Sequence, residues 1–512
     1  MKKRLIGAVG VIATSAAVLT GCGGGGEAAQ SSGDGSFSYM MPDRQMAWLN
    51  DQKFMPAIAE ATGVTTELVD GGPQGEYYQR VDLDIASNGL GDAAIVSLAQ
   101  MQVYGPQGAF VDLAPLIAEH GPHIQRYIDD HPEFASLVTQ DDGAIYGLIL
   151  ERPRIGAVTM YRTDMFEKAG IKETPKNIAE LTDAMRTLKK AYGDDSSYYP
   201  MTGRDYFMNL LYAFGATFSV DEMGNTHGVY DASPALSLDV KSEGFLEAIK
   251  WYKTVYEEGL IDPIWVEGSM SEEDWQALIL NGDASITTDF FTRPAWFMAN
   301  GGPEIDPDFA VDVMMPFEDE AGNPLSPASN ATFDASRVFV IDRSSDEAVA
   351  IIEMLDYLYS DEGQTMLHYG VEGESYEVVD GAPQYLVRYD DVADSPVGTP
   401  VWAFHQDRIS YPAPVDNEAY YSFLDDLTGS YASEYFEERA TPHPVIRYTP
   451  EQQEEKSAIY AGLQTAMTAG FGEFVRGDRD LSEWDDFLAE LDALGYEDMV
   501  ALDAEAYAAQ QG

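Results

Sequence analysis

Cysteine is almost absent from this chain of 512 residues, because Cys22 is the only one. A single cysteine cannot form a disulfide within the chain, so disulfides do not stabilise the fold. Long apolar runs are equally scarce. After the run from Leu5 to Leu19, no segment reaches the roughly 20 apolar residues that a helix needs to span a bilayer.

Basic residues are few: 30 Lys and Arg stand against 87 Asp and Glu, a net charge of −57. The acids are spread along the sequence rather than gathered in a tail, which predicts a solvated acidic surface. Such a field opposes binding to nucleic acid or to anionic lipid through charge alone. It also disfavours polyanionic ligands unless the binding cleft carries its own arginines.

The motifs of several enzyme classes are missing. There is no Walker loop, no dinucleotide fingerprint and no Gly-x-Ser-x-Gly elbow. His120 and His123 have an HxxH spacing, but no helix-borne Glu or Cys accompanies them, so we interpret them as surface histidines. We therefore expect neither a metal nor a cofactor.

The first 22 residues have the organisation of a secretory signal: a basic start, an apolar run and a small-residue end. Leu19-Thr20-Gly21-Cys22 resembles a bacterial lipobox, in which Cys22 becomes the lipidated first residue. A plain cleaved signal and a free structural cysteine are the alternatives. Residues 23–35, rich in Gly and Ser, are expected to form a flexible linker. We expect a protein held on the extracytoplasmic face of the bacterial cell membrane by its lipid anchor only.

Strands and helices alternate after the linker. Strand-like runs at 37–41, 65–69 and 91–96 are separated by helical patterns at 50–62 and 76–88. This alternation predicts an α/β fold with doubly wound, mostly parallel sheets.

A charged break, Glu151-Arg152-Pro153-Arg154, divides two apolar runs at 144–150 and 156–161. It is typical either of a crossing between two lobes or of an ordinary βαβ step in one domain. Thr163 is predicted to cap a short helix that Gly170 ends, and Asn177 to open an amphipathic helix. That helix should bury Ile178, Leu181, Met185 and Leu188.

Motifs in this region and further along the chain resemble those of a known protein family. A recurring motif of the extracellular solute-binding proteins of ABC sugar importers resembles two segments here: residues 161–171, YRTDMFEKAGI, and residues 175–181, PKNIAEL. Residues 368–377, HYGVEGESYE, resemble a phrase of the large oligosaccharide-binding lipoproteins, a branch that includes alginate-binding members. Many members carry a calcium loop that residues 193–199 do not reproduce, because oxygen ligands at alternate positions are missing.

The resemblance implies a two-lobed fold of the periplasmic-binding-protein kind with a hinge between the lobes. Lobe 1 would comprise residues 36–152 with about 330–385, and lobe 2 residues 153–329 with about 386–512. It also implies a monomer that captures an oligosaccharide and delivers it to the permease subunits of an ABC transporter. Glu372 and Tyr376, in the second phrase, are expected to have packing roles.

A sugar site needs aromatic faces for the rings and planar polar groups for the hydroxyls, in loops at strand ends. The residues that fit this description come from both lobes and from the crossing. They are Asp43, Arg44, Trp48, Glu151, Arg154, Arg204, Asp205, Tyr206, Asp289, Phe290, Phe291, Arg293, Trp296, Trp402 and His405. Any single aromatic is more often a core residue, and the group near Phe290 is the best candidate.

Two alternatives stay open. A secreted glycan-processing enzyme would need two carboxyls about 5–10 Å apart across a cleft, and an acid-rich sequence supplies such pairs everywhere. A receptor of the same fold could instead bind peptides. The acidic balance favours a neutral oligosaccharide over a uronate, although Arg44, Arg154, Arg204 and Arg293 leave the uronate open.

Overall fold

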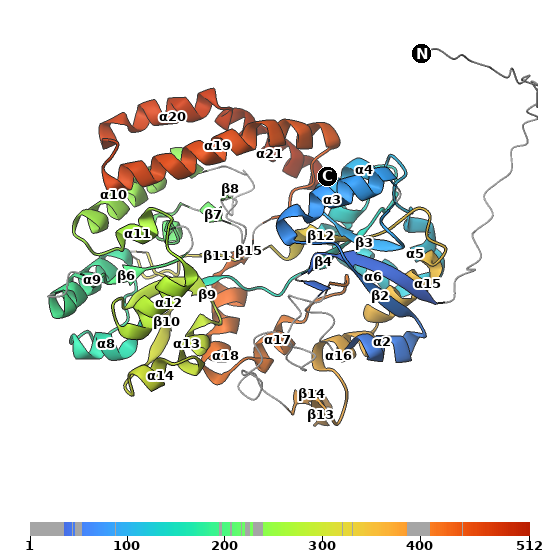
Figure 1. Cartoon of the computed structure of the whole chain (residues 1–512), viewed down its shortest axis with the longest axis horizontal. Helices are drawn as coiled ribbons and strands as arrows, with labels where there is room; N and C mark the ends of the chain where they lie inside the picture. Colours follow the sequence, from blue (N-terminus) through green and yellow to red (C-terminus); the bar gives the residue numbers. More distant parts are fainter. Residues whose placement is uncertain are drawn as a thin grey trace, which may run out of the picture.

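Two α/β lobes lie side by side, and chain segments pass between them near the middle of the molecule (Figure 1). The structure is a computed structural model. It describes residues 35–43, 45–46, 54–87, 89–193, 197–204, 207–216, 218–220, 226–228, 239–319, 321–329, 331–386, 410–442 and 444–511.

Lobe 1 is built on a five-stranded sheet with the order β2-β1-β3-β12-β4. Three adjoining strands of this sheet pair in parallel: β1 (Ser36–Met41), the edge strand β2 (Thr65–Asp70) and β3 (Ala93–Val96). The long strand β12 (Phe333–Ile341) pairs antiparallel with β3 on one side and with β4 (Leu148–Glu151) on the other.

Lobe 2 is built on a four-stranded sheet with the order β10-β5-β9-β6. Strand β5 (Ala157–Arg162) pairs antiparallel with β10 (Val311–Met314) and with β9 (Ile286–Phe290). Strand β6 (Met201–Thr202) pairs parallel with β9.

The α/β fold with two lobes, each built on a sheet whose strands mostly run the same way, is as expected. Most strands of each sheet point the same way, yet β12 in lobe 1 and β5 in lobe 2 are reversed and lie inside their sheets. Each reversed strand is the first one after the chain has crossed from the other lobe. Entering from the opposite end of the sheet forces the reversal, and alternation along the sequence carries no sign of it.

Helices cover the sheets. Those of lobe 1 are α2 (Phe54–Thr62), α3 (Gln74–Ser87), α4 (Leu98–Tyr104), α5 (Ala114–His120), α6 (Pro122–Asp130), α7 (Pro132–Val138), α15 (Ala348–Leu358) and α16 (Asp361–Tyr369). Those of lobe 2 are α8 (Thr163–Lys168), α9 (Ile178–Tyr192), α10 (Glu243–Glu257), α11 (Pro263–Val266), α12 (Glu272–Asn281), α13 (Arg293–Ala299), α14 (Gly302–Ile305) and α18 (Asp426–Ser433). Helix α17 (Asn417–Phe423) packs against both α16 and α18.

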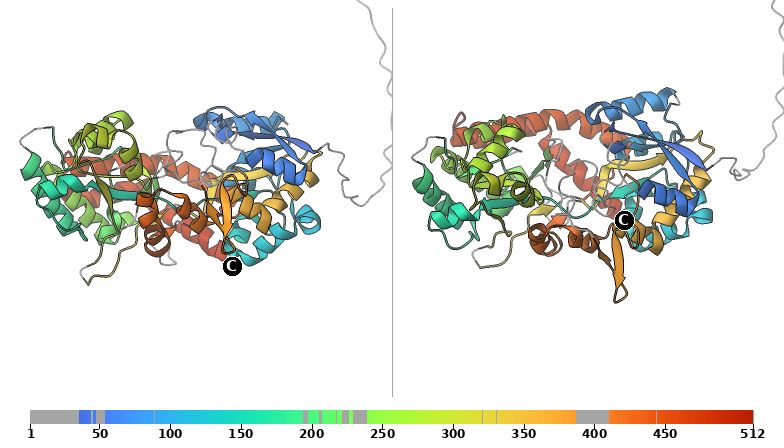
Figure 2. Two further views of the ribbon diagram at one scale, coloured as in Figure 1. Left: turned by 90° about the horizontal axis from the view of Figure 1, so that it is seen from below. Right: turned by 60° about the horizontal axis from the view of Figure 1, so that its bottom comes forward.

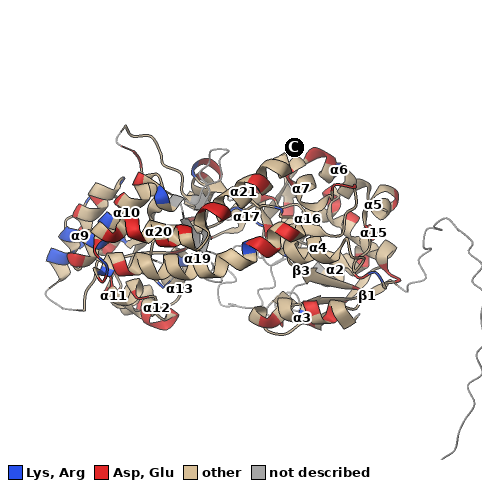
Figure 3. Ribbon diagram, turned by 90° about the horizontal axis from the view of Figure 1, so that it is seen from above, with Lys and Arg blue, Asp and Glu red and all other residues tan. Residues whose placement is uncertain are grey.

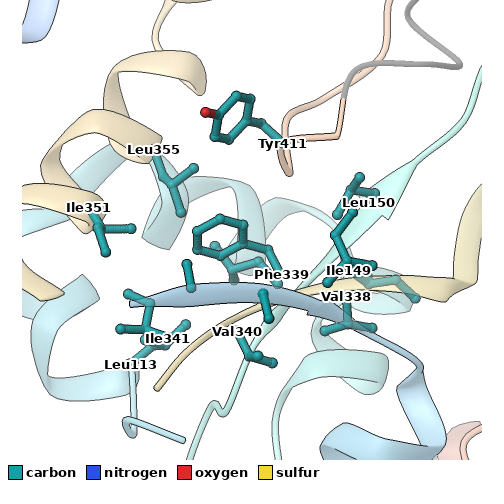
Figure 4. Close-up of a cluster of buried hydrophobic side chains, with 14 of the residues drawn as sticks. Leu113, Ile149, Leu150, Val338, Phe339, Val340, Ile341, Ile351, Leu355 and Tyr411 are labelled. Carbon is teal, nitrogen blue, oxygen red and sulfur yellow. The ribbon is translucent and has the colours of Figure 1, made fainter. Parts of the chain in front are cut away.

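The core of lobe 1 forms where β12 passes between β3 and β4. Val338, Phe339, Val340 and Ile341 are fully buried, with α15 packed above them (Figure 4). Tyr411 also enters this core, and its hydroxyl donates to Thr66 Oγ1 at 2.8 Å. Tyr411 and Ala413 belong to the stretch expected in lobe 2, yet both are buried in lobe 1.

The sheet of lobe 2 is buried on both faces. Val158 and Met160 of β5 point to a cluster covered by α12, α13 and α18, whereas Tyr161 points to the opposite cluster under α9 and α10. This alternation is the two-residue period of a strand. It explains why the run from Gly156 reads as continuously apolar, as strands buried on both faces do.

Local signals around the first lobe 2 helices are mostly confirmed. Asn177 caps α9 by accepting from the backbone N–H of Glu180 at 2.9 Å, and Leu181, Met185 and Leu188 are buried. The predicted cap at Thr163 is wrong. Thr163 is the first helical residue of α8, the cap position is Arg162, and no side chain caps this helix. The backbone of Thr163 instead bonds to Ala310 of the neighbouring chain segment.

Three C-terminal helices connect the lobes. Helix α19 (Pro450–Arg476) is about 40 Å long at 1.5 Å per residue and contacts α10 in lobe 2 and α4 in lobe 1. After the short α20 (Trp484–Ala493), helix α21 (Tyr496–Gln511) returns along α19 to α7 in lobe 1. Figure 1 shows this group lying along one side of the molecule.

A hairpin, β13 (Tyr376–Val379) and β14 (Ala382–Tyr385), projects from the body of the protein (Figure 2). Tyr376 is buried at its base and packs against Tyr369, as expected for a packing residue. Glu372 is exposed, so its expected packing role is not met.

The described surface is acidic over both lobes, and Lys and Arg gather mainly around α9 (Figure 3). Among the described residues, no helix is both long and apolar enough to cross a membrane.

Candidate functional site

The carboxyl ends of most strands in both sheets, all but the reversed β12 and β5, lie at the edge of the crossing between the lobes. In lobe 1, Phe333 at the start of β12 pairs with Glu151 at the end of β4. Because β12 is antiparallel to β3, the ends of β3 and β1 lie on the same side as Glu151. In lobe 2, Ala157 at the start of β5 pairs with Phe290 at the end of β9. Ligands of open α/β sheets bind at carboxyl ends, so this edge is the candidate site.

Two arginines meet at this edge in lobe 2. Arg204 follows β6, and Arg293 begins α13 just after β9. Asp289, fully buried on β9, accepts from Arg204 Nε at 2.5 Å and from Arg293 Nε at 3.1 Å. Glu272, the first residue of α12, lies 3.4 Å from Arg204 Nη1 and 2.8 Å from Arg293 Nη2. We call Arg204 and Arg293 the arginine pair.

Aromatic rings surround the arginine pair. Both guanidinium carbons lie 5.4 Å from the ring centroid of Trp275, which is buried and donates from Nε1 to Thr287 Oγ1 at 2.8 Å. Arg204 also lies over Phe290, and Arg293 over Trp296, at 5.8 and 5.2 Å. Such contacts favour a cation over an aromatic face. Phe290 and Trp296 are half-buried, so part of each side chain stays accessible.

The structure therefore brings together five residues selected from the sequence: Arg204, Asp289, Phe290, Arg293 and Trp296. Their common neighbours Glu272 and Trp275 were missed. Both come from α12, whose sequence reads as an ordinary capped amphipathic helix: Ser271 accepts from the N–H of Asp274, with acidic residues in the first turn. No local signal in the sequence joins this helix to the two loops.

The expectation that Phe291 faces a ligand is corrected. Its side chain is 2% exposed and its ring packs edge-on against Phe436, 5.5 Å away, and beside Tyr420. Tyr431 donates its hydroxyl proton to the Phe291 carbonyl. Phe291 belongs to the core, because helices from much later in the chain cover the face that the local pattern leaves open.

Glu151 lies at the crossing but is buried. Its carboxyl accepts from the Tyr127 hydroxyl and from the backbone N–H of Val415 at 2.9 Å. Burial raises the pKa of Glu151 to about 8. With His368 and Tyr411 it lines a pocket of about 10 Å³, room for a water molecule at most. The prediction that Glu151 contacts an oligosaccharide is not met in this arrangement, because the segment around Val415 covers it.

Arg154 is engaged in contacts that hold the crossing to the C-terminal half. Its Nη1 lies 3.2 Å from Glu437 Oε2, its backbone N–H donates to Asn417 Oδ1, and its carbonyl accepts from the Tyr421 hydroxyl. The side chain is half-buried. These contacts give Arg154 a structural function at the crossing.

Asp43 follows β1 and is exposed at the edge of lobe 1 that faces the crossing. The remaining predicted positions lie outside the described residues: Cys22, Arg44, Trp48, Asp205, Tyr206, Trp402 and His405. Part of the loop at 193–199 also lies outside them. Within the described residues, no three His, Cys, Asp or Glu side chains are grouped as metal ligands.

The chemical character of the site is that of a binding surface. The arginine pair supplies several N–H donors in fixed planes, Glu272 supplies acceptor oxygens, and Phe290 and Trp296 supply ring faces. Sugars present hydroxyls that donate and accept, on an apolar ring face that stacks on aromatics.

Known proteins are similar to this chain in sequence. A fructooligosaccharide ABC transporter substrate-binding protein, FusA of Streptococcus pneumoniae serotype 4, is 21% identical over 497 residues, covering 90% of this chain and 87% of FusA. Lipoprotein LipO of Bacillus subtilis is 22% identical over 325 residues, 60% of this chain and 61% of LipO.

A solved structure has the same fold. An HMO-binding, ABC-transporter-associated solute-binding protein from Bifidobacterium longum infantis superposes with a TM-score of 0.72 at 17% identity. The superposition covers 93% of this chain and 99% of that protein. Residues 42–372, well over half of the chain, match the bacterial extracellular solute-binding protein family. The chain belongs to the bacterial extracellular solute-binding protein family.

Proposed function

We propose that this protein is a lipid-anchored receptor that captures an oligosaccharide outside the cell and hands it to the permease of an ABC transporter. The observation that carries the proposal is the cluster of the arginine pair, Glu272, Phe290 and Trp296 at the strand ends that face the crossing. Relatives named for oligosaccharide binding support the ligand class.

Capture would work through lobe movement rather than chemistry. Residues 36–152 with about 330–385 would move against residues 153–329 and much of 386–512, with the crossing as the hinge. Sugar hydroxyls would pair with the arginine pair and Glu272 while a ring stacks on Phe290 or Trp296. No bond of the ligand breaks, so affinity and closure are the whole mechanism.

The anchor is the second part of the proposal. Cys22 ends an apolar signal and precedes a Gly/Ser linker, which would let the lobes stand away from the membrane. We expect a monomer that meets separate permease and ATPase chains. Mass spectrometry of the N-terminal peptide should show a lipid on Cys22 in the wild type and none in Cys22→Ser. An unlipidated Cys22 in the mature wild type would contradict the anchor.

Binding is tested with the purified full-length protein in a detergent that has no sugar headgroup. Thermal unfolding is followed with neutral oligosaccharides, acidic oligosaccharides and peptides. A ligand at 100 times its dissociation constant should stabilise the folded state by about 2.7 kcal/mol. A raised melting temperature with one glycan class, and recovery of that glycan intact, is the expected result.

The same experiment separates the alternatives. Shortened glycan products would favour a glycan-processing enzyme. Stabilisation by peptides and by no sugar would keep the fold and contradict the carbohydrate ligand.

A further inference from the structure

Glu272 is the exposed member of the charged cluster beneath the candidate ligand site. Its side chain is 48% exposed, whereas those of Arg204 and Arg293 are 17% and 16% exposed. The other carboxylate, Asp289, has no exposed side-chain surface. A ligand that reaches the arginine pair therefore comes close to the charge of Glu272 and never touches Asp289.

The four charges cancel. Two guanidinium groups face two carboxylates, and each arginine contacts both acids. The buried ring of Trp275 lies beside both guanidiniums, 5.4 Å from each guanidinium carbon. Without Glu272 the group would carry one net positive charge on its accessible side.

We propose that Glu272 makes this receptor selective for neutral over carboxylate-bearing oligosaccharides; the inference rests on the proposed function. A sugar hydroxyl can accept from a guanidinium N–H and donate to a Glu272 oxygen, so it uses both partners. A uronate carboxylate can accept from the same guanidinium, but its charge then lies within a few ångströms of Glu272. Specificity by such a repulsive element is a general device of binding proteins.

The surroundings add to the same effect. Asp43, on the facing edge of lobe 1, is a further exposed acid. Of the two arginines at the crossing, Arg154 is paired with Glu437. The other, Arg152, lies 3.8 Å from Asp334. Arg154 and the arginine pair are thus all paired with carboxylates, and the net charge of −57 further disfavours an anionic ligand.

The test replaces Glu272 with Gln and uses Glu273→Gln as the matched control. Glu273 is the next residue of α12, is exposed, and loses the same unit of charge without touching the arginine pair. Calorimetry measures the affinity for the neutral oligosaccharide that stabilises the protein best. It also measures the same oligosaccharide after oxidation of its primary hydroxyls to carboxylates.

In the wild type, the neutral form should bind about tenfold or more tightly than the oxidised form. Glu272→Gln should reduce this ratio by about tenfold, and the gain should shrink as salt rises. Glu273→Gln should leave the ratio unchanged. Thermal unfolding without ligand confirms that both variants are folded.

Three results would overturn the proposal. The first is a wild type that binds the oxidised form as tightly as the neutral one. The second is a folded Glu272→Gln variant with an unchanged ratio, and the third is an equal change in the Glu273→Gln control. Failure of every oligosaccharide to bind would instead overturn the proposed function, and the selectivity with it.

Discussion

Arg447 and Thr139 lie 308 positions apart in the chain, and the Arg447 guanidinium donates a hydrogen bond to the Thr139 carbonyl. The same guanidinium lies 3.1 Å from Asp141, and the Arg447 backbone N–H donates to Gln510 on α21. These contacts attach the C-terminal helices to lobe 1. Their attachment to lobe 2 is far larger, through Phe471, Phe474, Trp484 and Phe487 in its core. The helices are therefore part of lobe 2 that reaches across to lobe 1.

Replacing Arg447 with Ala should loosen this attachment. A charge-assisted hydrogen bond to the carbonyl of half-buried Thr139 is lost, at a cost of about 1–3 kcal/mol in the free energy of unfolding. Hydrogen exchange should rise at the end of α21, near Gln510, and stay unchanged in the aromatic core of lobe 2. Arg439→Ala is the control, because Arg439 forms only a surface pair with Glu434. Equal exchange in both variants would refute the attachment.

Asp289→Asn should destabilise the protein and weaken ligand binding together. The buried carboxylate of Asp289 balances the positive charge of two guanidiniums. An amide in its place removes this negative charge and one of the two acceptor oxygens. Breaking a buried ion pair costs about 3–5 kcal/mol, and the partial exposure of both arginines places this change near the lower end. Urea unfolding measures the loss. A change below about 1 kcal/mol would show that the arginine pair does not depend on Asp289.

Phe290 and Phe291 should behave differently although they are adjacent. Phe291→Ala removes a core ring and should cost about 3–5 kcal/mol of stability. Phe290→Ala, at a half-buried ring beside Arg204, should cost far less stability and mainly lower the affinity for the oligosaccharide. Unfolding and calorimetry on both variants check this. Unchanged affinity in Phe290→Ala would remove Phe290 from the site.

The pH dependence of stability should carry the signature of Glu151. Burial raises its pKa from 4.5 to about 8, so the folded state keeps a proton that the unfolded state has lost. Between these two values the unfolded chain binds fewer protons, and stability falls as pH rises, by roughly 1.4 kcal/mol per pH unit from this group alone. Below about pH 4.5 the cost is absent, and above about pH 8 it is complete.

Glu151→Gln removes this titration. Measured by urea unfolding between pH 5 and pH 9, the variant should gain stability relative to the wild type as pH rises. Parallel pH profiles for the two proteins would contradict a raised pKa at Glu151.

The loops of the site could be predicted because their signals are local. Phe290 ends a strand and Arg293 begins the next helix. A junction of this kind can be recognised from the neighbouring residues alone. Glu272 was missed because its contact with Arg204 joins positions 68 apart, with α10 and α11 between them in the chain. The core position of Phe291 depends on Phe436, and the covered position of Glu151 on Val415. The positions of Glu272, Phe291 and Glu151 are thus set by packing between segments that lie far apart in the chain. Such packing produces no periodic pattern of apolar residues in the sequence.

The direction of β12 and β5 has the same origin. The bounds of β5 agree with the apolar run at 156–161 to within one residue at each end. Its orientation depends on which lobe the chain has just left. The family resemblance implied two lobes, whereas alternation alone did not distinguish a crossing from a step within one domain.

The central claim is that this protein binds an oligosaccharide at the edge where the two sheets face each other. Its most direct test is calorimetry of the purified protein against neutral oligosaccharides, with Phe290→Ala and Arg204→Ala as site variants. The account predicts binding of an unmodified glycan by the wild type and a loss of affinity of about tenfold or more in both folded variants. Binding that both variants retain at full strength would place the ligand elsewhere, and the absence of binding to any oligosaccharide would contradict the account.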